Sequence, residues 1–130
     1  MNLAHWVGRG GFALLLASLS VGAAAAEVPY DKARFAAALE RCAPIVVAFV
    51  ADWCSTCSVQ KPIVTELIED PKFKGVTVFI ADFDKELDLR KRLRVAQQST
   101  FVAYKGCKEV GRSTGQTRKD AIARLFAKTL

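Results

Sequence analysis

The apolar run Ile-Val-Val-Ala-Phe-Val at residues 45–50 limits the folds open to this chain more than any other segment. Six apolar residues in a row, without alternation, predict a strand that is buried on both faces, as in the sheet of an α/β protein. The run leads into Trp53 and the tetrapeptide Cys-Ser-Thr-Cys at 54–57, where a helix over residues 54–69 is predicted. The sequence therefore predicts a buried strand that delivers two cysteines to the start of a helix.

Two cysteines at this spacing favour thiol–disulfide exchange. The sulfurs of Cys54 and Cys57 fall on one face of a helical turn, close enough to form a disulfide. Cys54 is predicted to be exposed in the first turn, where unpaired N–H groups and the positive end of the helix dipole stabilise a thiolate. Cys57 is predicted to be shielded, one turn deeper. We therefore expect Cys54 to attack a substrate disulfide and Cys57 to resolve the mixed disulfide.

The remainder of the chain alternates between helical and strand patterns. Asp31 is predicted to cap a first helix, and Thr117 with Asp120 to form a capping-box-like start to the last one. The other predicted elements are helix 32–40, strand 45–50, helix 54–69, strand 76–81, helix 86–93, and a hairpin of strands 101–104 and 109–112. This order predicts an α/β fold with a central mixed β-sheet flanked by helices.

Residues 1–26 have the features of a secretory signal peptide. Arg9 precedes an apolar core at 12–21, and small residues at 22–26 allow cleavage after Ala25 or Ala26. The core is shorter than the roughly 20 residues of a spanning helix, which disfavours the alternative of an uncleaved membrane anchor. We expect export to the bacterial periplasm, with residues 27–130 as one small domain.

The cysteine pair also has readings other than exchange. Structural zinc needs four ligands, and the only histidine, His5, lies in the predicted signal peptide, so we expect no metal and no cofactor within one chain. Copper(I) or an iron–sulfur cluster bound between two molecules by the same cysteines stays an alternative. A purely structural disulfide is disfavoured because Trp53 and the helix start place the pair at the surface.

Several motifs together resemble the thioredoxin superfamily over nearly all of residues 27–130. They are Ala-Asp-Trp-Cys-Ser-Thr-Cys at 51–57, Pro62 eight residues after the first cysteine, Ser-Thr-Phe-Val-Ala-Tyr-Lys-Gly at 99–106, and Gly115. Ala-Asp-Trp-Cys and the Asp-Pro connection at 70–71 are most similar to the periplasmic thioredoxin-like domain of membrane thiol:disulfide interchange proteins. The resemblance implies a thioredoxin-like fold, disulfide-containing exported proteins as substrates and a membrane thiol conduit as electron donor. We expect a monomer, and the family's first strand is at best vestigial at 28–30.

The resemblance also exposes three departures. Ser99 stands where the family has a cis-proline, and we expect a trans bond before it because a cis bond to a non-proline residue costs roughly 2.5–4 kcal/mol. By resemblance, the segment Gln98, Ser99 and Thr100 faces the substrate, and Trp53 helps to orient it. Ala48 and Ile80 replace the family's buried aspartate and its lysine partner, which leaves Asp82 as a candidate proton acceptor for the resolving cysteine.

The residues between the two active cysteines bear on the direction of exchange. Strongly oxidising relatives place a histidine there, whereas Ser55 and Thr56 offer only hydroxyl dipoles. We therefore predict a protein-disulfide reductase, with a potential closer to the roughly −270 mV of thioredoxin than to the roughly −120 mV of the strong oxidant.

A further prediction concerns the other two cysteines, Cys42 and Cys107. In a thioredoxin-like fold, strands 45–50 and 101–104 are antiparallel neighbours, so Cys42 and Cys107 fall at the sheet end opposite the active pair. We predict a structural disulfide between them, with two free cysteines as the alternative.

The basic segment at 90–94 is interpreted as a solvated helix face that can steer an acidic protein, and we expect no nucleic-acid partner.

Overall fold

A computed structural model describes residues 25–130, so the predicted signal peptide lies, except for its last two residues, outside the described part of the chain. The elements are β1 (Ala26–Pro29), α1 (Lys32–Glu40), β2 (Ile45–Val50), α2 (Ser55–Glu69), the 3₁₀ helix η1 (Pro71–Phe73), β3 (Thr77–Asp82), α3 (Leu87–Leu93), β4 (Thr100–Lys105), β5 (Lys108–Thr114) and α4 (Lys119–Ala127). The strands form one mixed sheet in the order β1-β3-β2-β4-β5. The predicted fold class is confirmed.

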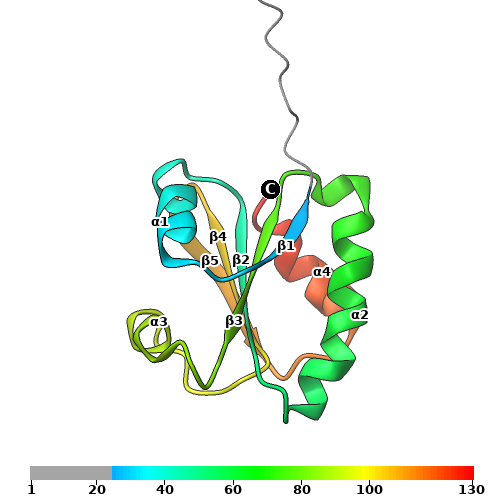
Figure 1. The fold of residues 1–130 in the computed structure, drawn as a ribbon. Coiled ribbons are helices and arrows are strands. Elements are labelled where there is room, and N and C mark those ends of the chain that lie inside the picture. The colour runs from blue at the N-terminus through cyan, green and yellow to red at the C-terminus, as the bar shows by residue number, and fades with distance from the viewer. Residues whose placement is uncertain (1–24) are drawn as a thin grey trace, which may run out of the picture.

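The sheet separates two layers of helices, as Figure 1 shows, with α1 and α3 on one face and α2 and α4 on the other. Strands β1, β2 and β3 run parallel, while β4 pairs antiparallel with β2 and β5 antiparallel with β4. Parallel strands with helices on both faces need apolar side chains on both sides. The core therefore lies in two clusters, one beneath each helix layer.

Strand β2 lies at the centre of the sheet and contributes to both clusters. The side chains of Ile45, Val47 and Phe49 pack in the cluster beneath α1 and α3. Those of Val46 and Ala48 pack in the cluster beneath α2 and α4. All five residues are at most 2% exposed, which confirms the prediction of a strand buried on both faces.

Of the two predicted helix caps, the structure confirms the one at α1 and contradicts the one at α4. Asp31 caps α1 as predicted, because its carboxylate accepts a hydrogen bond from the Arg34 N–H at 2.8 Å. The capping box at the last helix is wrong: α4 is capped by Arg118 without a side-chain hydrogen bond. Thr117 precedes that cap, and the Asp120 carboxylate binds Arg118 and Arg124 instead.

The first strand is a full member of the sheet, and the expectation of a vestigial one is wrong. Residues Ala26–Pro29 pair with β3 at four positions, and the Tyr30 N–H donates to the Ile80 carbonyl at 2.8 Å. An edge strand needs only backbone pairing on one side, so its weak apolar pattern does not prevent it from forming.

Within residues 25–130, none of the helices has the length and hydrophobicity of a membrane span.

Candidate functional site

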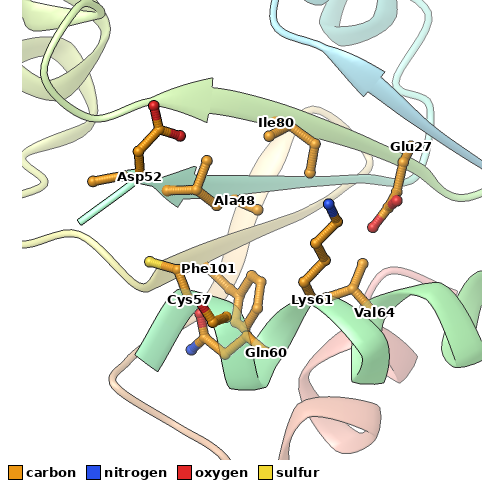
Figure 2. A pocket seen from close by; sticks show the side chains of 12 residues that line it. Glu27, Ala48, Asp52, Cys57, Gln60, Lys61, Val64, Ile80 and Phe101 are labelled. Atoms are coloured by element: carbon orange, nitrogen blue, oxygen red, sulfur yellow. The ribbon is translucent and has the colours of Figure 1, made fainter. Parts of the chain in front are cut away.

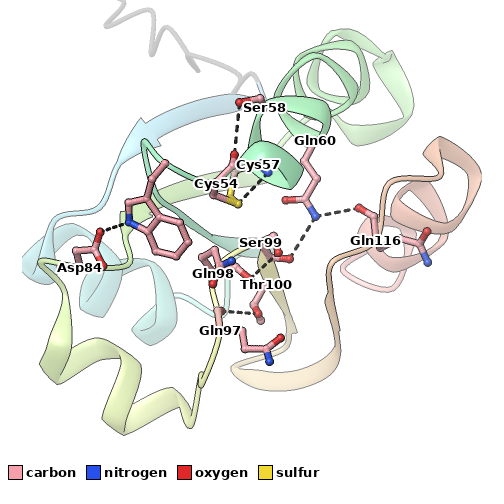
Figure 3. The surroundings of a disulfide bond; sticks show 11 residues. Cys54, Cys57, Ser58, Gln60, Asp84, Gln97, Gln98, Ser99, Thr100 and Gln116 are labelled. Atoms are coloured by element: carbon pink, nitrogen blue, oxygen red, sulfur yellow. Dashed lines mark hydrogen bonds between the residues drawn. A yellow bond between two sulfur atoms is a disulfide. The ribbon is translucent and has the colours of Figure 1, made fainter.

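The two active-site cysteines lie where β2 passes into α2. Cys54 is the N-cap of the helix, and its sulfur accepts a hydrogen bond from the Cys57 N–H at 3.0 Å (Figure 3). The Cα atoms of Cys54 and Cys57 are 5.3 Å apart, and their sulfurs are joined. The predicted proximity is confirmed. A thiolate on Cys54 would keep the same N–H donor and the positive end of the helix dipole.

Cys54 is more buried than the sequence indicated, whereas Cys57 is shielded as predicted. Cys54 is 3% exposed and Cys57 7%, so the prediction of an exposed Cys54 is wrong. The reason is packing: the two side chains belong to the core cluster that also contains Phe83 and Val95. A buried sulfur is reached only from the rim of the site, so the residues that form the rim control access to it.

Trp53 forms the most prominent part of that rim. It is 62% exposed, and its indole N–H donates to the Asp84 carboxylate at 2.7 Å (Figure 3). The hydrogen bond holds an exposed aromatic side chain in one orientation beside Cys54. Sequence reasoning placed Trp53 at the site and missed Asp84, because the two residues are 31 positions apart and no local pattern joins them.

The segment from Gln97 to Thr100 supplies a second part of the site. The peptide bond between Gln98 and Ser99 is trans, as predicted, and Ser99 has a φ of +55°, in the left-handed region. The Ser99 hydroxyl donates to the Gln98 carbonyl at 2.6 Å, and the Thr100 hydroxyl to the Gln97 carbonyl at 2.8 Å. These local bonds hold the backbone in a conformation that a non-glycine residue rarely adopts.

Gln60 connects this segment to the helix, and sequence reasoning missed it. Its side-chain amide donates to the Ser99 carbonyl at 3.2 Å and to the Gln116 carbonyl at 2.9 Å (Figure 3). Gln60 is only 3% exposed, so its buried amide is satisfied by these two carbonyls. The Ser99 carbonyl also accepts from the Gly115 N–H at 3.0 Å. A lone glutamine on a helix gives no sequence signal of such a role.

A cavity of about 300 Å³ lies beside Cys57 (Figure 2). Ala48 and Ile80 line it from neighbouring positions of β2 and β3. The lining residues are Glu27, Ala48, Val50, Ala51, Asp52, Cys57, Ser58, Gln60, Lys61, Val64, Ile80 and Phe101. The side chains of Glu27 and Lys61 point toward one another across it in Figure 2. Burial raises the pKa of Glu27 above its ordinary value, and the charge of Lys61 partly offsets this.

Asp82 is not among the residues that line the cavity beside Cys57. Its carboxylate accepts hydrogen bonds from the N–H groups of Asp84 and Lys85 and forms an ion pair with the Lys85 side chain at 3.3 Å. Desolvation raises the pKa of Asp82, but these hydrogen bonds outweigh it and lower the pKa below its ordinary value. The structure therefore shows Asp82 organising the turn after β3, and its role as proton acceptor stays a prediction.

The second cysteine pair lies at the other end of the sheet. Cys42 follows α1 and Cys107 occupies the turn between β4 and β5, and the two sulfurs are joined with the Cα atoms 4.4 Å apart. Within the described residues, no group of three or more His, Cys, Asp or Glu side chains is arranged to hold a metal ion.

Comparisons with known proteins agree with this geometry. The thioredoxin family model matches residues 27–128. The chain is 37% identical over 83 residues to thioredoxin H-type of Fagopyrum esculentum, covering 64% of this chain and 69% of that one, and 30% identical over 84 residues to thioredoxin of Chlamydia muridarum, covering 65% and 80%. The crystal structure of Trxlp from Edwardsiella tarda EIB202 superposes with a TM-score of 0.76 at 35% identity, covering 78% of this chain and 98% of that one.

Proposed function

Because this chain belongs to the thioredoxin family, and so is a thiol–disulfide oxidoreductase, we propose that it acts as a periplasmic protein-disulfide reductase. The observation that carries the proposal is the position of Cys54 at the N-cap of α2, with the Cys57 N–H directed at its sulfur. A hydrogen-bond donor and a helix dipole at one sulfur lower its pKa and select it as the attacking group.

The reaction proceeds in two exchanges. The Cys54 thiolate attacks one sulfur of a substrate disulfide, forms a mixed disulfide and releases the other substrate sulfur as a thiolate. The Cys57 thiol then loses its proton and attacks Cys54, which closes the Cys54–Cys57 bond and releases the reduced substrate. The substrate gains two electrons, and the protein must be reduced again by a dithiol donor.

The side chains around Cys54 support docking of an extended substrate segment. Trp53 is fixed by Asp84 on one side, and Ser99 is held in its left-handed conformation by Gln60 and its own hydroxyl on the other. Gln98, Ser99 and Thr100 are the proposed substrate-facing residues, together with Trp53. Ser99 and Thr100 are only 5% and 3% exposed, so Gln98 and Trp53 supply the accessible surface.

The reducing direction follows from the absence of a charged residue between the cysteines, since Ser55 and Thr56 do not favour the dithiol over the disulfide. The proposed location follows from the signal-like residues 1–26. An exported reductase requires electrons from inside the cell, so a membrane thiol conduit of the kind that serves the resembling interchange-protein domains is the proposed donor. The proposed clients are exported proteins with disulfides.

Two measurements test the proposal. Equilibration of the Cys54–Cys57 pair in glutathione buffers should give a potential closer to that of thioredoxin, and a value near that of a strong oxidant would reverse the assigned direction. In cells, Cys57→Ser should accumulate mixed disulfides with exported proteins, whereas the matched Cys54→Ser variant should trap none. Trapped proteins that are all cytoplasmic, or an unprocessed N-terminus by mass spectrometry, would contradict the proposed location.

A further inference from the structure

The surroundings of Cys42 and Cys107 point to a second thiol–disulfide exchange site, separate from Cys54 and Cys57. We propose that this disulfide reacts with small anionic thiols of the glutathione class. This disulfide lies at the end of the sheet opposite the start of α2. Its reaction does not depend on the direction of exchange at Cys54.

Both sulfurs belong to exposed residues. Cys42 follows the C-terminal end of α1, and Cys107 lies in the turn between β4 and β5; the structure shows both as exposed, along with Arg41, Lys105 and Lys108. By contrast, Cys54 and Cys57 are packed in the core. A thiol from solution therefore meets the Cys42–Cys107 bond without the rim that restricts access to Cys54. Exposed disulfides of this kind are more easily reduced than buried ones.

Both cysteines also have unfavourable backbone conformations. The φ of Cys42 is +52° and that of Cys107 is +69°, in the left-handed region that favours glycine. Cys42 is at the end of a helix, where its N–H donates to the Leu39 carbonyl at 2.9 Å, and Cys107 follows Gly106 in a turn with two successive positive φ values. Glycine or asparagine is usual at both kinds of position. The helix end and the turn set these conformations, so the two cysteines stay side by side in both redox states.

The reduced form has a hydrogen-bond acceptor in place. The Cys107 sulfur lies 3.0 Å from the Leu39 carbonyl oxygen, at the C-terminal end of α1. A disulfide sulfur has no proton to donate there, whereas a Cys107 thiol does. Reduction therefore adds one interaction at this position and leaves the thiol with a partner.

Charge around the pair favours anionic reactants. Arg41 precedes Cys42, and Lys105 at the end of β4 and Lys108 at the start of β5 lie on either side of the turn that contains Cys107. The acidic residues within two positions of either cysteine are Glu40 and Glu109, and the carboxylate of Glu109 already binds Arg112 at 2.6 Å. The excess of positive charge attracts an anionic thiolate and stabilises the cysteine thiolate that leaves.

The exchange balances in two steps. A glutathione thiolate attacks one sulfur of the pair, the Cys42–Cys107 bond breaks, and the other sulfur leaves as a thiolate that takes a proton from water. A second glutathione thiolate attacks the mixed disulfide and releases the second cysteine. Two thiols are oxidised to one disulfide, and the protein disulfide gains two electrons and two protons.

The first test uses the oxidised full-length Cys54→Ser/Cys57→Ser protein, in which only the second pair can react. The protein is equilibrated in glutathione buffers of increasing reducing strength, quenched with acid, alkylated and mapped by peptide mass. We expect Cys42 and Cys107 to open in the buffers that reduce the Cys54–Cys57 pair of the unaltered protein. Adding Cys42→Ser to this variant should leave a glutathione adduct on Cys107. A second pair that stays closed in all of these buffers would overturn the proposal.

The second test separates the role of charge from that of exposure. In Lys105→Gln/Lys108→Gln, glutathione should open the pair about fivefold more slowly. 2-Mercaptoethanol should be slowed less, because its thiolate carries one negative charge fewer than that of glutathione. The matched control is Lys85→Gln/Lys91→Gln, which removes the same charge elsewhere and should leave both rates unchanged. Equal slowing with both thiols, or equal slowing in the control, would contradict a site built for anionic thiols. Circular dichroism checks that each variant is folded.

Discussion

The two disulfides of this domain place the same bond in opposite settings. Cys54 and Cys57 are three positions apart and buried at the start of α2, where a backbone N–H is directed at one sulfur. Cys42 and Cys107 are 65 positions apart and exposed, where they connect the end of α1 to the β4–β5 turn. The surroundings of each disulfide decide what it can do. The first pair is placed to exchange with proteins, and the second joins distant parts of the chain while staying open to small thiols.

The largest expected effect separates the two pairs by activity. Cys54→Ser should reduce dithiothreitol-driven insulin reduction to the rate without protein, because a serine hydroxyl does not form the mixed disulfide. The Cys42→Ser/Cys107→Ser variant should retain the activity, since its changes lie at the other end of the sheet. Loss of activity in the second variant would show that the two ends are not independent.

The next effect separates the pairs by stability. Cys42→Ser/Cys107→Ser should lower the free energy of unfolding by about 2–4 kcal/mol, because the bond closes a long loop in the unfolded chain. Cys54→Ser/Cys57→Ser should lower it less, since the loop that it closes is short. Urea unfolding of both variants beside the oxidised protein measures the difference. A larger loss in the second variant would contradict this account of the long-range bond.

A smaller effect concerns the polar connection at the active end. Gln60→Ala should lower the free energy of unfolding by about 1–3 kcal/mol, because the Gln116 carbonyl loses its side-chain donor and the Ser99 carbonyl keeps only the Gly115 N–H. Val59→Ala, at the exposed neighbouring position, is the matched control and should change it by less than about 0.5 kcal/mol. Thermal or urea unfolding of both variants measures the two changes. Equal changes would mean that the hydrogen bonds of Gln60 add nothing to stability.

The smallest effect is a pH dependence near the second pair. A hydrogen bond from Arg112 lowers the pKa of Glu109 below its ordinary value of 4.5, and Arg112 also donates to the carbonyls of Leu93 and Arg94. A carboxylate with a depressed folded pKa adds stability that is complete above its ordinary pKa and is lost as the pH falls through the folded value.

Comparing Glu109→Gln with the unaltered protein between about pH 6 and about pH 3 isolates this contribution. We expect a stability difference below about 1 kcal/mol at the higher pH that vanishes at the lower one, since the pair is partly exposed. A stability difference that does not change with pH would mean that the shape of the Glu109 side chain, and not its charge, is responsible.

Sequence patterns predicted the parts of the structure that depend on local or periodic features. The unbroken apolar residues of β2 predicted burial on both faces, and Asp31 predicted the start of α1. The position of two cysteines at a helix start predicted their proximity. Each of these depends on residues that are neighbours in the chain or that repeat along one element.

The parts that sequence patterns missed depend on contacts between distant segments. Cys54 is buried in a core cluster that also contains Phe83 and Val95, from segments that follow β3 and α3. The bonds of Gln60 to Ser99 and of Trp53 to Asp84 join residues 39 and 31 positions apart. Propensity and spacing contain no information on such pairs, since tertiary packing alone brings them together.

The central place of β2 has a consequence for how genes encoding this domain change over time. Its side chains alternate between two cores, with Val47 on one face and Val46 and Ala48 on the other. Gain or loss of a single codon within β2 would exchange the faces of every residue beyond it and turn the following cysteines away from their place. Lineages can therefore replace one apolar residue by another in β2, while its length stays fixed.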